Sequence, residues 1–167
     1  AMADKLDELG AEVLEYPTIA IERMEGQAKK DLLGAIGRVD DYDWVIFTSV
    51  NGVEVFFDEL YSAGADTRLL GDCKICAIGP ATARKLRENG IVADVMPGEY
   101  VAEAVVEAIG ALEGDMSGQN VLVPRASGAR IELIGGLEEL GAHVDEISTY
   151  RAVCDEGPKI HLADMIA

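Results

Sequence analysis

The chain has 167 residues, of which 49% are hydrophobic and 27% are charged, the balance of an ordinary globular protein. Its 14 basic and 31 acidic residues give a net charge of −17, which argues against a nucleic-acid partner, because phosphate contacts need clustered lysine and arginine. Its apolar runs fall far short of the roughly 18 residues that cross a membrane, and no secretory signal is visible. We therefore expect a cytoplasmic protein without a membrane or nucleic-acid partner.

The predicted elements alternate between strands and helices along the chain. The first is the end of a helix over 3–10, with Gly10 as its C-terminal stop. Strands are predicted over 11–21, 44–48, 74–78, 93–97, 120–124 and 143–153. Helices are predicted over 26–39, 51–63, 80–89, 100–112 and 130–140. Pro80 suits a first helical position, and Gly90 suits a helix end.

This alternation predicts one α/β domain. Strands that are separated by helices form a parallel sheet with helices on both faces. Five strands between residues 44 and 153 match a doubly wound, flavodoxin-like parallel five-stranded sheet. Residues 1–21 and 155–167 do not fit inside that domain, so we expect the chain to be a piece of a larger protein.

The cysteine pattern leaves two interpretations. Cys73 and Cys76 form a C-x-x-C motif, which is typical of redox and zinc sites. They flank the start of a predicted strand, however, where residues three apart point to opposite faces. With Cys154 the total is only three, and no second ligand pair follows at zinc spacing. We favour buried structural thiols in a reducing compartment, and no metal site is predicted.

Small polar residues follow three of the predicted strands. Ligands of open α/β sheets bind at the carboxyl ends of the strands, where helices begin and their free N–H groups favour anions. The residues at these ends are Thr48, Ser49 and Asn51, then Gly79 and Thr82, then Arg125 and Ser127. Any one of these turns is also explained by simple helix capping, so capping and ligand contact both remain open.

Several catalytic and nucleotide-binding motifs are absent from the sequence. It holds neither G-x-x-x-x-G-K-[ST] nor G-x-S-x-G, and no G-x-G-x-x-G follows a strand. Neither His143 nor His161 has a serine or cysteine nucleophile turn nearby, so a catalytic triad is not indicated. Tyr150 lies near the end of the last predicted strand. Its apolar ring and polar tip suit either a cleft wall or the core.

Three segments carry a resemblance to a known family. They read DWVIFTSVNGVEVFF (43–57), AIGPATARKLRENGIVADVMPGEYVAEAVVEAI (77–109) and VLVPRASGARIELIGGLEELGAHVDEISTYRAV (121–153). In this order and spacing the chain resembles the uroporphyrinogen-III synthases, enzymes of tetrapyrrole biosynthesis.

The resemblance implies a two-domain arrangement in which one α/β domain is inserted into another. Residues 25–148 resemble the complete inserted domain. Residues 1–18 and 154–167 resemble pieces of the discontinuous domain, with linkers at 19–24 and 149–153. The strands that would complete the second domain are not in this chain, so the chain alone is expected to have little activity.

The resemblance also implies a reaction. The substrate would be hydroxymethylbilane, a linear tetrapyrrole with eight carboxylates. A cyclising hydro-lyase of this family dehydrates it, inverts the last pyrrole ring and closes uroporphyrinogen III without a cofactor. Family positions that line the interdomain cleft match Thr48, Ser49, Thr82, Arg125 and Tyr150. Tyr150 would be the catalytic hydrogen-bond donor to the leaving hydroxyl.

Two other interpretations stay open beside the enzyme. One is a non-catalytic α/β module that binds a ligand or a protein partner, although strand ends carrying threonine, serine and glycine argue against a phosphorylated receiver domain. The other is an inert fragment that dimerises through exposed interdomain surfaces. The full protein is expected to be a monomer.

Overall fold

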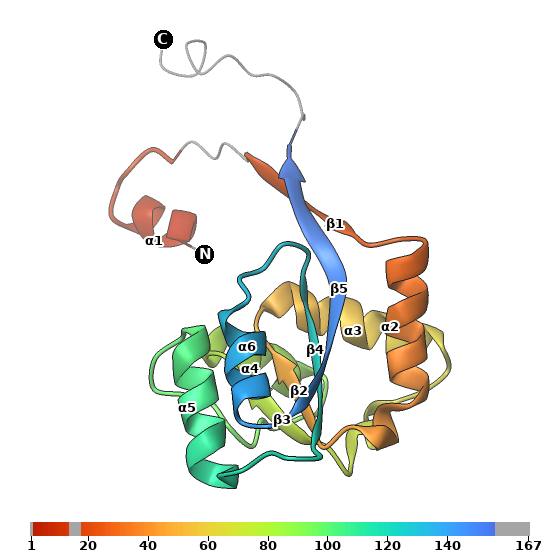
Figure 1. Cartoon of the computed structure of the whole chain (residues 1–167). Coiled ribbons are helices and arrows are strands. Elements are labelled where there is room, and N and C mark those ends of the chain that lie inside the picture. Colours follow the sequence, from red (N-terminus) through yellow and green to blue (C-terminus); the bar gives the residue numbers. More distant parts are fainter. Residues whose placement is uncertain (1, 14–17, 156–167) are drawn as a thin grey trace. The chain divides into compact units, whose positions relative to one another are not determined.

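The computed structural model describes residues 2–13 and 18–155 (Figure 1). The chain divides into a larger unit, residues 23–151, and a smaller unit made from residues up to 22 and from 152 onward. The smaller unit holds helix α1 (Met2–Glu8), which ends shortly before Gly10 at a φ of 82°, as predicted. Of the expected return segment, residues 154–167, all but residues 154 and 155 lie outside the described part.

The larger unit contains most of the elements expected from the alternating pattern. Its helices are α2 (Gln27–Gly37), α3 (Val50–Ser62), α4 (Pro80–Glu88), α5 (Ala102–Glu113) and α6 (Glu132–Glu139). Its internal strands are β2 (Trp44–Phe47), β3 (Lys74–Ala77) and β4 (Asn120–Ala126). Two short 3-10 helices, η1 (Val39–Asp41) and η2 (Thr67–Leu70), were not predicted. Strands β1 (Ile19–Arg23) and β5 (His143–Cys154) cross the boundary between the units.

The strands form one sheet in the order β1-β5-β4-β2-β3. The pairs β5–β4, β4–β2 and β2–β3 are parallel. If β2, β3, β4 and β5 are numbered 1 to 4, their order across the sheet from β3 is 2-1-3-4. This matches the first four strands of the flavodoxin-like order 2-1-3-4-5. The point at which the order reverses lies between β2 and β4.

The prediction of five parallel strands was wrong at the fifth strand. Residues 93–97 form only an isolated bridge between Val95 and Cys76. Pro97 has no N–H to extend that ladder. The fifth strand is β1 instead. Because the Met24 N–H bonds the Thr149 carbonyl and the Asp155 N–H bonds the Thr18 carbonyl, β1 and β5 run antiparallel.

The sheet of the larger unit is covered on both faces. All four residues of β2 are buried, which is typical of a strand between two helical layers. Val45 and Phe47 pack with the apolar faces of α2, α3 and α4, including Phe56, Phe57 and Leu86. Trp44 and Ile46 pack with those of α5 and α6. Among the described helices, none is long and apolar enough to cross a membrane.

Candidate active site

The Ser49 side chain caps a helix, as predicted, and also contacts Tyr150. Ser49 follows β2 with an extended backbone and is the N-cap of α3, where its Oγ accepts the Gly52 N–H at 3.0 Å. The same oxygen accepts the Tyr150 hydroxyl at 2.9 Å. Capping therefore does not exclude a second role, because a serine oxygen has two acceptor positions.

Tyr150 reaches Ser49 because β5 contains a bulge. The register passes from Arg125↔Ser148 to Ala126↔Tyr150, so Thr149 is the extra residue. Without it, Tyr150 would share a face with Val144, which packs against α5 and α6. With it, the Tyr150 ring enters the core on the opposite face, beside α3, and is only 8% exposed.

Arg125 lies on the other face of the sheet from Tyr150. On β4 it shares a face with Val121 and Val123, which pack against α5 and α6, and it is 3% exposed. Its Nε donates to Glu146 at 2.8 Å, and its Nη1 donates to the Arg130 carbonyl at 2.6 Å. Its Nη2 lies 2.8 Å from the same Glu146 oxygen, but without hydrogen-bond alignment. The buried guanidinium thus secures the turn before α6.

The other predicted residues occupy three places. Thr48 and Asn51 are half-buried on either side of the Ser49 cap. Ser127 is exposed, and its N–H donates to the Tyr150 carbonyl at 2.7 Å. Gly79 is the N-cap of α4, and Thr82 is buried in the first turn of that helix. The structure thus brings the Ser49 side chain and the Ser127 backbone each into contact with Tyr150, and places Gly79 and Thr82 at the neighbouring end of β3.

Of the three helices that follow these strand ends, α3 and α4 are suited to an anion. The first turns of α3 and α4 contain no acidic residue, whereas those of α5 and α6 contain Glu103 and Glu132. Gly79 also has no side chain to cap α4. The first turns of α3 and α4 therefore carry no carboxylate that would oppose an anion.

Three residues near the site were not predicted. The Tyr100 ring lies beside Gly79, where an added Cβ would come within 3.1 Å of it. Thr149 makes the bulge, and its hydroxyl donates to the Arg125 carbonyl at 3.2 Å. Glu146 is the partner of Arg125. Only Tyr100 had a usable sequence signal, since an aromatic residue before a helix and near a glycine turn suggests packing.

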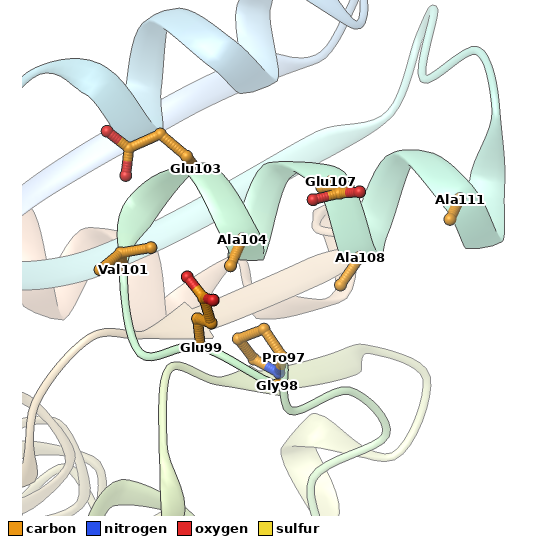
Figure 2. Close-up of a pocket in the computed structure, with 9 residues that line it drawn as sticks. All are labelled: Pro97, Gly98, Glu99, Val101, Glu103, Ala104, Glu107, Ala108 and Ala111. Atoms are coloured by element: carbon orange, nitrogen blue, oxygen red, sulfur yellow. The ribbon is translucent and has the colours of Figure 1, made fainter.

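A surface hollow on the larger unit is lined by other residues than those predicted for the site. Its volume is about 520 Å³, and it is bounded by α5 and the loop before it (Figure 2). The lining includes Glu99, Glu103 and Glu107 but none of the predicted site residues. Three carboxylates make this hollow a poor place for a polyanion.

The C-x-x-C motif is structural, as predicted. Cys73 packs on one side of the sheet and Cys76 on the other, and both are buried. Burial raises the pKa of the Cys73 thiol to about 11 and that of Cys76 to about 12. Neither thiol is positioned for redox chemistry.

The fold and this group of residues define the class of the protein. It is a doubly wound α/β protein with the Ser49–Tyr150 hydroxyl pair and two acid-free helix starts at the carboxyl ends of its strands, the usual ligand position of such folds. The family model described as uroporphyrinogen-III synthase HemD matches residues 1–167. The chain belongs to this family.

Individual relatives agree with the family. The chain is 32% identical over 153 residues to a porphyrin biosynthesis protein HemD of Ruminiclostridium josui, covering 89% of this chain and 29% of that one. It is 34% identical over 155 residues to a uroporphyrinogen-III synthase of Synechococcus elongatus, covering 91% of this chain and 56% of that one.

Solved structures agree in fold. A uroporphyrinogen III synthase from the extremely thermophilic bacterium Thermus thermophilus has a TM-score of 0.64 at 20% identity, covering 98% of this chain and 62% of that one. The chain therefore spans less than two thirds of the length of each of these proteins.

Proposed function

We propose that this chain supplies one α/β half of a uroporphyrinogen-III synthase, a cytoplasmic lyase. The full enzyme would convert hydroxymethylbilane to uroporphyrinogen III, expelling water and inverting the last pyrrole ring. The observation that carries the proposal is the family match over the whole chain, together with the Ser49–Tyr150 hydroxyl pair at the reversal of the sheet.

The loss of the substrate hydroxyl needs little direct assistance from the protein. The lone pair of the pyrrole nitrogen drives the C–O bond to break, and the electron pair of that bond leaves with the oxygen. A hydroxyl group that donates to the departing oxygen assists this step. The Ser49–Tyr150 pair offers such a donor, with Thr48 and Asn51 beside it.

The carboxylates of the substrate would be held by helix starts and hydroxyl groups. The acid-free first turns of α3 and α4, and Gly79 as the N-cap of α4, support this assignment. Thr82 lies in the first turn of α4 but is buried. Ser127 would add a hydroxyl from the turn before α6. Arg125 is assigned to holding that turn, because its side chain is buried and engaged by Glu146 and the Arg130 carbonyl.

We assign the rest of the site to a second α/β domain. Residues 1–18 and 154–167 would be pieces of that domain, and residues 19–24 and 149–153 would be the linkers. The division of the chain near residues 22 and 152 supports this assignment.

The test is to supply freshly made hydroxymethylbilane to this chain and to a full-length polypeptide containing it. Products are then separated into type I and type III isomers, with buffer alone as the control for the spontaneous type I product. Type III product from the full-length polypeptide supports the proposal. A full-length polypeptide that gives only the type I isomer contradicts it.

A further inference from the structure

One hydroxyl proton of the Ser49–Tyr150 pair is not donated to any described residue. Ser49 Oγ accepts hydrogen bonds from the Gly52 N–H at 3.0 Å and the Tyr150 O–H at 2.9 Å. A serine hydroxyl has two acceptor positions and one proton. With both acceptor positions filled, the Ser49 proton remains, and no other described residue accepts it.

Burial indicates which end of the pair meets a ligand. The Tyr150 side chain belongs to the core beside α3 and is 8% exposed. Ser49 is less buried and stands between the half-buried Thr48 and Val50 at the start of α3. The proton available to a ligand is therefore that of Ser49.

We propose that Ser49 donates the hydrogen bond to the departing hydroxyl of the substrate, and that Tyr150 is a positioning residue that acts through Ser49. The inference rests on the proposed function. Tyr150 fills the second acceptor position of Ser49 and so directs the remaining proton outward. Both proposed roles involve hydrogen bonds only, so no covalent bond of Ser49 or Tyr150 forms or breaks.

Suitable variants separate this role from the helix cap. Ser49→Thr keeps both the cap and the donor. Ser49→Gly removes the hydroxyl, yet glycine is tolerated at an N-cap far better than alanine. Tyr150→Phe removes the phenolic hydroxyl and keeps the ring in the core. Each single variant and the Ser49→Gly/Tyr150→Phe double variant are made in the full-length polypeptide.

We expect the effects of Ser49→Gly and Tyr150→Phe on kcat to be non-additive in a double-mutant cycle. Ser49→Gly is expected to lower kcat about tenfold or more, with a smaller change in KM, and Ser49→Thr to recover most of that loss. Adding Tyr150→Phe to Ser49→Gly is expected to change kcat by less than about twofold. A further large loss in the double variant would mean that Tyr150 itself meets the substrate, and would overturn the inference.

Equilibrium unfolding of the same variants provides a readout without substrate. Ser49→Gly and Tyr150→Phe are expected to be coupled in unfolding if their hydrogen bond is formed. Absence of coupling would overturn the inference about Ser49 and Tyr150. The proposed function would still stand if the wild-type polypeptide gives type III product. A wild-type polypeptide that yields only type I product would instead overturn the proposed function, and the role of Ser49 with it.

Discussion

A Cβ atom at Gly52 would lie 2.9 Å from the carbonyl oxygen of Pro124. The first turn of α3 therefore lies directly against the end of β4. The obstacle is backbone, so no flexible side chain can give way. This contact sets the spacing between the turn that carries Ser49 and the strand end that carries Arg125.

Gly52→Ala is therefore expected to destabilise the protein by about 1–3 kcal/mol, as overpacking does in a close-packed core. The free energy of unfolding in urea measures the effect. Gly37→Ala is the matched control, because an added Cβ there meets no atom within 4 Å. A Gly52→Ala variant as stable as the wild type would contradict the close contact.

The paired glycines of α6 are expected to respond in opposite directions. A Cβ at Gly136 would lie 2.7 Å from Val106 Cγ2, whereas one at Gly135 would meet nothing within 4 Å. Gly136→Ala should destabilise by about 1–2 kcal/mol. Gly135→Ala should stabilise by up to about 1 kcal/mol, because alanine favours a helix interior. Thermal unfolding compares the two, and equal effects would exclude this packing of α5 on α6.

The ion pair between Arg125 and Glu146 is expected to be asymmetric. The Arg125 side chain is 4% exposed and the Glu146 side chain is 39% exposed. Removing the glutamate leaves a charge without compensation in the core, whereas removing the arginine leaves a carboxylate that reaches water. Glu146→Met should therefore destabilise by on the order of 3 kcal/mol, and more than Arg125→Met. The reverse order in urea unfolding would contradict this.

Asp145 is expected to contribute to acid sensitivity. Tyr42 donates a hydrogen bond to its carboxylate and Arg38 lies beside it, so the pKa of Asp145 is lowered in the folded state. The stabilisation is present above the unfolded pKa of about 4 and is lost as the pH falls through the lowered folded pKa. Solvent exposure keeps it below about 1 kcal/mol.

Unfolding free energies between pH 7 and pH 2 measure this contribution. Asp145→Asn should be less stable than the wild type at neutral pH, and the difference should shrink in acid. Asp72→Asn, which removes one exposed charge, is the control. A difference between wild type and Asp145→Asn that does not change with pH would contradict the assignment.

Alkylation should distinguish the cysteines. Cys154 is exposed, while Cys73 and Cys76 are buried with raised pKa values and few thiolate anions at neutral pH. Iodoacetamide is expected to label Cys154 in the native protein and all three cysteines in denaturant, as followed by mass spectrometry. Rapid native labelling of Cys76 would contradict its position under α5 and α6.

Local patterns in the sequence predicted most of the elements. The apolar spacing of Val53, Phe56, Phe57 and Leu60 located α3, and all four side chains are buried. Pro80 begins α4 as expected. Such signals depend on residues within one or two helical turns, so they can be recognised without knowing the fold. The same locality explains why the polar strand ends could be identified as candidates.

Contacts between distant residues were decided only by the tertiary structure. The strand predicted over 11–21 overlaps β1, but its place in this sheet could not be predicted, because β1 pairs with β5, far along the chain. Alternation along β5 would have put Tyr150 on the face of Arg125, and the Thr149 bulge reverses this. A bulge depends on the register with the neighbouring strand, which local sequence does not specify. The sequence alone thus identified Ser49 and Tyr150 as candidates, and only the folded sheet brought their hydroxyl groups together.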